Sequence, residues 1–185
     1  MSGKVTDNIG RASGLIKVVS AEGGLDVADQ WRITSDKAMA TTGDAFTANW
    51  ERVDTGGQGT ITGSQMSESS GIFTFPSTGI YAVTFRGIMY TSNNAAGTVK
   101  IGLEIHATTD DSAYAAISQG FDWNPSNQFT FKQVDVNSLM DVTDTANVKV
   151  KFLCMNSGTN NSDRVWEGST SINNTYATFT KLGAT

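Results

Sequence analysis

Scarce residue types exclude several classes of protein at once. The chain of 185 residues contains one cysteine, one histidine and two prolines. A single cysteine excludes a framework of intrachain disulfides, and a single histidine excludes the usual histidine-rich metal sites. Apolar runs extend over only a few residues, so we expect no membrane-spanning segment. The formal net charge of -5, without any basic cluster, argues against nucleic acid as a partner.

The abundant residue types favour short strands joined by polar turns. Ser, Thr and Asn together make up about three in every ten residues, and 19 glycines add to the turn-forming capacity. This mixture is poor in the Leu, Glu, Lys and Ala runs of helical bundles. It nevertheless holds too much Val, Ile, Phe and Trp for a disordered chain. The composition therefore predicts a turn-rich, all-β protein.

Alternating apolar and polar residues identify individual strands. Residues 99–106 have the period of two that a half-buried strand requires, with Val99, Ile101, Leu103 and Ile105 on one face and Lys100, Glu104 and His106 on the other. Further strand-forming runs cover residues 80–89, 129–132, 148–152 and 175–182, and turn-forming clusters lie between them. About eight to ten short strands separated by turns predict an antiparallel β-sandwich or barrel.

Residues 1–30 differ in composition from the rest of the chain. They contain five glycines and no aromatic residue, so they cannot bury enough surface to fold alone. We expect an extended N-terminal arm over residues 1–30, held against a partner, and one β-domain over residues 31–185. The start of the chain predicts neither a signal peptide nor a membrane anchor, which favours synthesis in a reducing cytoplasm. Cys154 is expected to be a buried structural thiol.

One motif in the middle of the chain resembles a known fold family. Residues 71–83 read Gly-Ile-Phe-Thr-Phe-Pro-Ser-Thr-Gly-Ile-Tyr-Ala-Val, and they resemble the core motif of the complement-head and tumour necrosis factor-like jelly roll. The motif has a physical reason. Pro76 cannot continue a strand ladder, Gly79 can adopt a positive φ, and Tyr81 then places its ring in the core. Residues 175–182 are similar to the last strand of that family.

This resemblance implies an antiparallel jelly-roll β-sandwich that assembles as a homotrimer through aromatic residues around a threefold axis. Four aromatic residues are candidates for the trimer interface or for the core of each sandwich: Tyr81, Phe85, Tyr176 and Phe179. Some members of the family hold calcium near the trimer apex. The acidic pairs at 110–111 and 141–144 lack an ordered calcium-loop pattern, so we expect solvated carboxylates there, with no metal and no cofactor.

A second resemblance lies in the arm. Residues 5–17, Val-Thr-Asp-Asn-Ile-Gly-Arg-Ala-Ser-Gly-Leu-Ile-Lys, look like the opening of many structural proteins of tailed bacteriophages, especially marine ones. In these, a short N-terminal segment precedes a jelly roll of the complement-head type. The resemblance implies a non-enzymatic virion protein, a trimer on the particle surface that forms a head decoration or part of a tail fibre or spike. It would assemble in the host cytoplasm, and its arm would bind other virion proteins through Val5, Ile9, Arg11, Leu15 and Ile16.

Catalysis finds little support among the residues. His106 is the only imidazole, and it occupies an outward position of its strand. The sequence has no Gly-x-Ser-x-Gly elbow, no His-Glu-x-x-His, no phosphate-binding glycine loop with a lysine and no Cys-x-x-Cys. Paired carboxylates for sugar cleavage stay formally open, but the acidic residues are spread through loops. We expect a protein that is not an enzyme.

Two tryptophans raise an alternative function. Trp123 and Trp166 lie beside polar residues in predicted loops, where an exposed indole can stack on a sugar or pack against a protein. The alternative is a receptor- or glycan-binding adhesion module that contacts the host surface. Both tryptophans could equally cover the ends of the sandwich or lie in a trimer interface, while Trp31 and Trp50 are expected in the core or an interface. A cellular complement-like adhesion protein is a third hypothesis, which would require an export signal.

Overall fold

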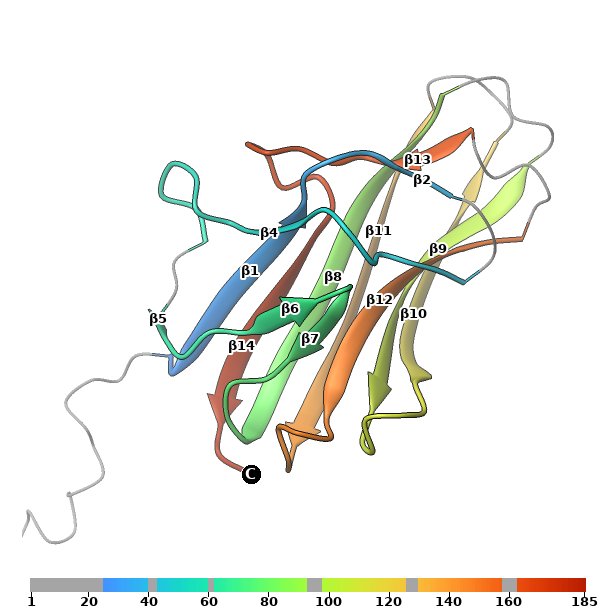
Figure 1. Cartoon of the computed structure of the whole chain (residues 1–185). Helices are drawn as coiled ribbons and strands as arrows, with labels where there is room; N and C mark the ends of the chain where they lie inside the picture. The colour runs from blue at the N-terminus through green and yellow to red at the C-terminus, as the bar shows by residue number, and fades with distance from the viewer. Residues whose placement is uncertain (1–24, 40–42, 60–61, 93–97, 126–129, 158–162) are drawn as a thin grey trace, which may run out of the picture.

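The computed structural model describes residues 25–39, 43–59, 62–92, 98–125, 130–157 and 163–185. Every element in this part of the chain is a β-strand, and no helix that could span a membrane occurs in it. The strands form two antiparallel sheets that face each other across a hydrophobic core (Figure 1). This arrangement confirms the prediction of an all-β antiparallel sandwich.

The large sheet is built around one long strand. Its main order is β2 (Lys37–Ala38), β13 (Arg164–Trp166), β8 (Gly79–Thr91), β14 (Tyr176–Gly183), β1 (Val27–Ile33) and β4 (Trp50–Arg52). Two more strands join it, β11 (Phe131–Val142) on β8 and β5 (Thr62–Gly63) on β1. β8 pairs with β11 almost from end to end, and on its other side it pairs first with β14 and then with β13.

The small sheet covers the large one. Its order is β10 (Ala115–Asn124), β9 (Val99–Thr108), β12 (Lys149–Asn156), β7 (Ile72–Thr74) and β6 (Ser67–Ser69), with β3 (Asp44–Ala45) paired to β12. From β8 the chain crosses to β9 and β10 and then returns to β11 beside β8, so β10 and β11 meet at one flank. Gly120 permits this approach, because a Cβ there would lie 2.8 Å from the carbonyl oxygen of Asp135.

Inward-facing apolar side chains of both sheets fill the core. The predicted apolar face of β9 is buried, as are alternate residues of β8 such as Val83 and Met89. Aromatic rings join the two sheets at the centre of the sandwich. The ring centroid of Phe85 on β8 lies 4.5 Å from that of Phe152 on β12, and Phe73 on β7 lies 5.1 Å from Phe179 on β14. The core therefore depends on contacts between strands that are far apart in the sequence.

The turn before β8 has the geometry that the motif at residues 71–83 predicts. Gly79 has a φ of 145°, and a Cβ at this position would lie 2.5 Å from the carbonyl oxygen of Gly183. A side chain at position 79 would therefore be excluded both by the backbone conformation and by space. The Tyr81 ring lies in the core 4.7 Å from the Phe75 ring, and its hydroxyl donates to the Ser77 carbonyl oxygen at 3.0 Å.

The first strand begins inside the segment that composition assigns to the arm. β1 starts at Val27, so residues 27–30 belong to the large sheet. The earlier part of the arm, residues 1–24, lies outside the described residues.

Cys154 on β12 is a buried, free thiol. The thiol donates to the carbonyl oxygen of Asp44 on β3 at 3.2 Å. Burial raises the pKa of the Cys154 thiol to about 12, so at neutral pH the group is an unreactive thiol rather than a thiolate. This confirms the expectation of a buried structural cysteine.

Candidate functional surfaces

The outer face of the large sheet carries exposed aliphatic side chains at one end. Leu139 on β11 is 68% exposed and Leu182 on β14 is 57% exposed. Between them, β8 contributes the partly exposed Ile80 and Ala82, with Ala82 directly opposite Leu139. We call these four residues the aliphatic patch. An antiparallel sheet that faces water normally carries polar residues there, so exposed aliphatic residues of this kind are typical of an interface.

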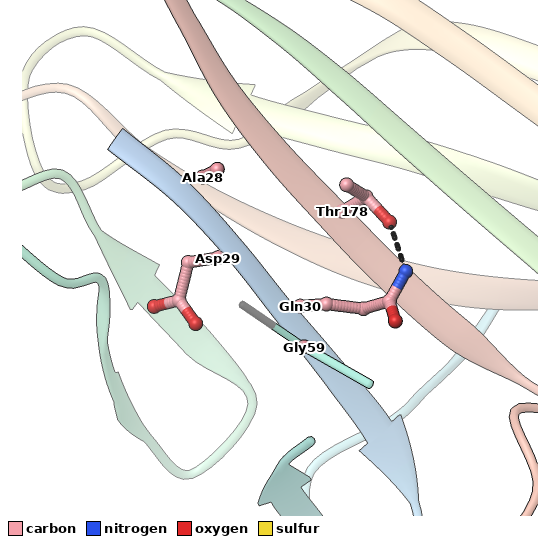
Figure 2. A pocket seen from close by; sticks show the side chains of 5 residues that line it. All are labelled: Ala28, Asp29, Gln30, Gly59 and Thr178. Atoms are coloured by element: carbon pink, nitrogen blue, oxygen red, sulfur yellow. Dashed lines mark hydrogen bonds between the residues drawn. The ribbon is translucent and has the colours of Figure 1, made fainter. Parts of the chain in front are cut away.

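Neutral hydrogen-bonding side chains occupy the same face on β1 and β14. Gln30 donates from Nε2 to Oγ1 of Thr178 at 2.9 Å, and its Oε1 accepts from Nδ2 of Asn173 at 2.6 Å. Figure 2 shows Gln30 and Thr178 facing each other at a hollow of about 160 Å³, which is also lined by Ala28, Asp29 and Gly59. Because the Asp29 carboxylate is buried, the exposed groups of this hollow are amides and hydroxyls. They can hydrogen-bond a partner but are poor acids and bases.

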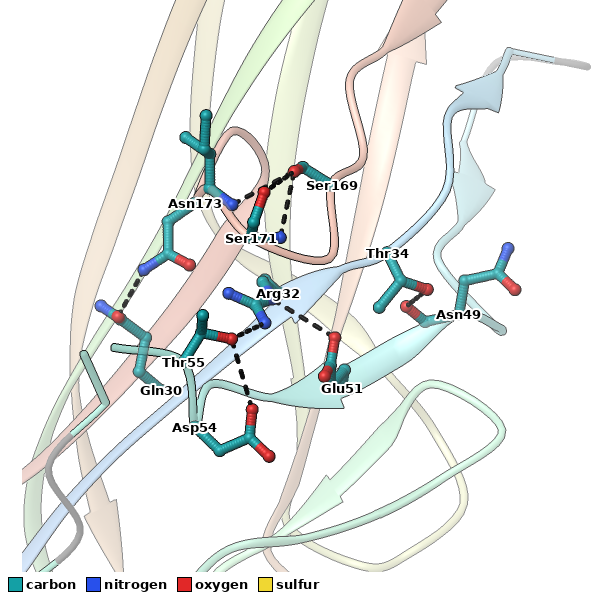
Figure 3. A network of polar contacts seen from close by, with 11 residues as sticks. Gln30, Arg32, Thr34, Asn49, Glu51, Asp54, Thr55, Ser169, Ser171 and Asn173 are labelled. Atoms are coloured by element: carbon teal, nitrogen blue, oxygen red, sulfur yellow. Dashed lines mark hydrogen bonds and ion pairs between the residues drawn. The ribbon is translucent and has the colours of Figure 1, made fainter. Parts of the chain in front are cut away.

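A buried arginine beside this hollow fixes the neighbouring loops. The Arg32 side chain, on β1, is fully buried, and it donates from Nε to Oε2 of Glu51 at 3.3 Å and from Nη2 to Oγ1 of Thr55 at 2.7 Å. Figure 3 shows Arg32 between the segment that carries Glu51 and Thr55 and the loop that carries Ser169 and Asn173. These contacts give Arg32 a structural role at the border of the outer face.

The outer face of the small sheet carries two exposed aromatic side chains on β10. Trp123 is 61% exposed and Phe121 is 39% exposed. Lys100 on β9 lies opposite Trp123 in the register, and its Nζ is 3.8 Å from the centroid of the Phe121 ring, a cation–π contact. Gly102, opposite Phe121, makes room for that ring, because a Cβ at position 102 would collide with it. We call Lys100, Phe121 and Trp123 the aromatic–lysine site.

A small hollow borders the aromatic–lysine site. Its volume is about 190 Å³, and it is lined by Lys100, Met155, Asn156 and Ser157. Two hydrogen bonds hold its edge: the Ser157 amide donates to the Lys100 carbonyl oxygen at 2.9 Å, and the Lys100 amide donates to the side-chain Oγ of Ser157 at 3.0 Å. The hollow thus has an apolar wall from Met155 and a cationic rim from Lys100.

A buried carboxylate lies further along β9. Glu104 is 4% exposed, and its Oε2 lies 2.7 Å from Nε2 of His106. The other carboxylate oxygen of Glu104 accepts a hydrogen bond from Nε2 of Gln119 on β10. His106 lies on the outward side of β9, as the alternation predicts, but it is only partly exposed. Both oxygens of the carboxylate are therefore satisfied within the sheet.

Trp166 is a correction to the sequence interpretation. The sequence places it in a loop and leaves open whether it contacts a ligand, covers the end of the sandwich or lies in a trimer interface, whereas the residue lies in β13 and its side chain is fully buried. β13 pairs with β8 and directs the indole onto Gly87, where a Cβ would lie 2.7 Å from the ring. The prediction that Trp166 contacts a ligand is wrong, because the residue is part of the core.

The residues predicted for the trimer interface, the core and virion attachment lie in different parts of the chain. Tyr81, Phe85 and Phe179 are fully buried in the core, while Tyr176 is partly exposed on β14, opposite Arg86 in the register. Trp31 and Trp50 pack against the core, as expected. The candidate attachment residues lie outside the described residues: Val5, Ile9, Arg11, Leu15 and Ile16.

The acidic loop residues make local contacts. Asp110 accepts hydrogen bonds from Oγ1 of Thr108 at 2.8 Å and from the amides of Ser112 and Ala113 at 3.0 Å, and these bonds hold the pKa of Asp110 well below its usual range. Asp111 pairs with Nζ of Lys149 at 2.6 Å. Within the described ranges, no group of three His, Cys, Asp or Glu residues could hold a metal ion.

The sequence does not predict the position of two groups of surface residues. In residues 131–142 the odd positions face outward, and they include Leu139 and Phe131 among polar residues. The alternation is visible in the sequence. It does not reveal that these two side chains are exposed, because leucine and phenylalanine are also ordinary core residues. Lys100 was predicted to be outward-facing, and only the pairing of β9 with β10 brings it to Phe121 and Trp123.

Comparison with known proteins identifies the fold. No family model matches the sequence, and no curated protein matches it. The Eiger TNF structure from S. frugiperda matches with a TM-score of 0.59 at 10% identity, covering 88% of this chain and 96% of that one. Murine APRIL at pH 5.0 matches with a TM-score of 0.57 at 12% identity, covering 84% and 98%. The globular domain of the zebrafish complement 1qA protein matches with a TM-score of 0.53 at 11% identity, covering 86% and 99%.

These likenesses show the fold alone, because the sequence identities are so low. The chain is a jelly-roll sandwich of the TNF and complement C1q type. This confirms the fold that the motif at residues 71–83 implies.

Proposed function

We propose that this protein is a non-enzymatic jelly-roll module that assembles as a homotrimer through the outer face of its large sheet. The observation that carries the proposal is the aliphatic patch, in which the Leu139 and Leu182 side chains are more than half exposed on the outer face of the large sheet. Because each leucine is already partly covered, a partner that covers it adds about 1 to 2 kcal/mol of favourable burial. The family that residues 71–83 resemble is homotrimeric, which supports three copies rather than two.

The polar part of the same face suits an interface as well. Gln30 on β1, Thr178 on β14 and Asn173 just before β14 are partly exposed and form a chain of neutral hydrogen bonds. Such groups can pair with a neighbouring copy without burying a charge, which keeps the desolvation cost low. The face also carries the Arg86–Asp135 ion pair and the exposed Asp141, so it combines an aliphatic centre with a polar and charged rim, the usual composition of a specific protein–protein interface.

Replacing Leu139 by aspartate tests the assembly. A carboxylate in the aliphatic patch has to be desolvated when a second copy covers it, so we expect Leu139→Asp to be monomeric where the unmodified protein is trimeric. Sedimentation velocity at micromolar concentration measures the mass. The matched control is Ile72→Asp, which places the same group on the outer side of the small sheet and should leave the trimer intact. A trimeric Leu139→Asp, or an unmodified protein that is monomeric, would contradict the proposal.

The finer form of the proposal places the trimer on the surface of a tailed-bacteriophage particle, as a head decoration or part of a tail fibre or spike. Its support is the resemblance of residues 5–17 to the opening of phage structural proteins. In this proposal the arm binds capsid or tail proteins, while the jelly roll self-associates and faces outward.

Deleting residues 2–24 separates these two roles. The deletion ends before β1, which starts at Val27, so the jelly roll keeps all its described strands. We expect soluble trimers that are absent from purified virions assembled with the truncated protein alone. Monomers would show that the arm makes the trimer, and full incorporation into virions would show that it is not the attachment segment.

A second candidate function is binding of a receptor or glycan on a host surface. Trp123 favours it, because an indole that is 61% exposed on a sheet face is an available stacking surface. The two functions are compatible, since the aliphatic patch and the aromatic–lysine site lie on opposite outer faces of the sandwich.

A further inference from the structure

The aromatic–lysine site combines two exposed aromatic rings with one ammonium group. We propose that Lys100, Phe121 and Trp123 bind a saccharide that carries a carboxylate. This inference rests on the second function proposed above and names the class of its ligand. It is independent of the trimer, which uses the opposite face.

Trp123 supplies the stacking surface. Its side chain projects from the C-terminal end of β10. At this point the Trp123 amide donates a hydrogen bond to Oδ1 of Asp122 at 2.6 Å. A sugar ring presents a face of C–H groups, which packs on a flat aromatic face, while its hydroxyls remain free to hydrogen-bond. Phe121, two residues along β10, extends the aromatic surface in the direction of the strand.

Lys100 supplies the charge. No carboxylate among the described residues lies within ion-pair distance of Lys100, whereas Lys132 pairs with Asp122 at 3.0 Å and Lys149 pairs with Asp111 at 2.6 Å. The Phe121 ring positions the Lys100 ammonium at 3.8 Å without neutralising it. A carboxylate on a ligand can therefore form a charge-assisted hydrogen bond with this ammonium.

Nearby carboxylates of the protein do not compete for the same position. Lys132 lowers the pKa of Asp122, which stays ionised and engaged in its ion pair with that lysine. Glu104 is buried, and Gln119 and His106 occupy its two oxygens. Both carboxylates are therefore engaged with partners other than Lys100.

The hollow beside Lys100 gives room for a second part of the ligand. Its volume of about 190 Å³ is small compared with a drug-sized pocket of roughly 300 Å³ or more. It can take a substituent or part of a neighbouring ring, against the side chain of Met155 and the hydroxyl of Ser157. A ligand that stacks on Trp123 can therefore place a substituent or part of a neighbouring ring in this hollow.

The position of the site on the sheet favours a saccharide over a peptide. An extended peptide gains affinity by pairing its backbone with an open strand edge. At Lys100 the backbone amide and carbonyl already bond to Ser157. On the end strand β10 the Trp123 amide is bonded to Oδ1 of Asp122, and β11 packs against the flank of β10. A ligand at this site can therefore contact side chains but cannot pair with the backbone. Saccharides are recognised through side-chain contacts of this kind.

Binding of matched acidic and neutral oligosaccharides tests the inference. The acidic probes are 3′-sialyllactose and trigalacturonate, and their neutral counterparts are the methyl esters of the same two oligosaccharides. We expect at least one acidic probe to bind about tenfold more tightly than its neutral counterpart, as measured by NMR titration of the full-length protein, because only the acid can pair with Lys100. Which of the two binds better distinguishes a sialic acid from a uronic acid.

Three variants assign the binding to this site. Lys100→Met should remove the preference for the acid, and Trp123→Ala should weaken the acidic and neutral probes alike. The matched control is Lys151→Met, which removes a lysine of the same sheet face whose Nζ lies 4.3 Å from the Tyr114 ring and should leave binding unchanged.

Other outcomes overturn the inference. Equal binding of acid and ester, an unchanged preference in Lys100→Met, or Lys100-dependent binding of a polyglutamate peptide without any binding of saccharide would each do so. The mass of every variant by sedimentation keeps this test separate from the trimer. Loss of the trimer with sugar binding retained counts against the proposed assembly, and the reverse counts against the saccharide site.

Discussion

Replacing Asp29 by alanine is expected to lower the free energy of unfolding by about 3 to 5 kcal/mol, the cost of breaking a buried charge pair by removing one partner. The Asp29 side chain is fully buried in β1. Its carboxylate accepts hydrogen bonds from Nε of Arg52 at 3.1 Å, from the amide of Met66 at 2.9 Å and from Nε1 of Trp31 at 3.2 Å. Alanine leaves all three donors without their acceptor.

The position of these donors explains why the effect is large. Arg52 comes from β4, and Met66 lies in the segment that leads into β6, so one carboxylate connects β1 with two other parts of the chain. The Arg52 guanidinium also lies 4.5 Å from the Trp31 ring, which holds the cation beside the core. Without Asp29, this cation, whose side chain is 27% exposed, stays beside the core but loses its counter-charge.

An exposed ion pair provides the control. Asp26 lies just before β1, its Oδ2 is 3.8 Å from Nζ of Lys181, and its side chain is 77% exposed. We expect Asp26→Ala to change the free energy of unfolding by less than about 1 kcal/mol. Urea unfolding of both variants at one protein concentration measures the difference, and for Asp29→Ala the melting temperature should fall by about 6 to 20 °C. A cost for Asp29→Ala no larger than that for Asp26→Ala would contradict this account.

Replacing Trp166 by alanine is expected to cost about 3 to 5 kcal/mol of stability, as for other large aromatic residues removed from a core. The indole is fully buried and packs against Gly87, and Leu103 of the small sheet lies beside the same glycine. Alanine would leave a cavity between the sheets, because the short strand β13 is tied to β8 by its backbone and cannot collapse into the space.

Trp123→Ala is the matched comparison for this second prediction. Trp123 is 61% exposed, so its removal should change the free energy of unfolding by no more than about 0.5 kcal/mol. Thermal unfolding monitored by circular dichroism compares the two variants. Similar melting temperatures for Trp166→Ala and the unmodified protein would contradict the assignment of Trp166 to the core.

The individual strands could be predicted because their signal is local. The alternation of Val99, Ile101, Leu103 and Ile105 is the alternation of buried residues on β9, and Gly79 begins β8 where the motif placed a turn. A strand buries one face in any sandwich, so the pattern holds whichever strands become neighbours. The resemblance of residues 71–83 then narrowed the sandwich to a jelly roll.

Surfaces could not be predicted in the same way, because they depend on pairing between distant segments. Trp123 and Trp166 have similar polar neighbours in the sequence, yet one is exposed and the other is buried. The difference arises because the pairing of β13 with β8 turns the Trp166 side chain inward onto Gly87, whereas the Trp123 side chain projects from the outer face of the small sheet. A local pattern carries no information about such neighbours.

The sequence by itself determined the class of the protein: an all-β chain without a disulfide framework, with a polar surface and a core of alternating apolar residues. Composition and the period of two are sufficient for that conclusion, because both act within single strands. Only the tertiary structure decided where the exposed groups gather. The register of β8 with β11 places Leu139 opposite Ala82, and the register of β9 with β10 places Lys100 opposite Trp123. Side chains from separate strands form a surface only once long-range hydrogen bonding has set those registers.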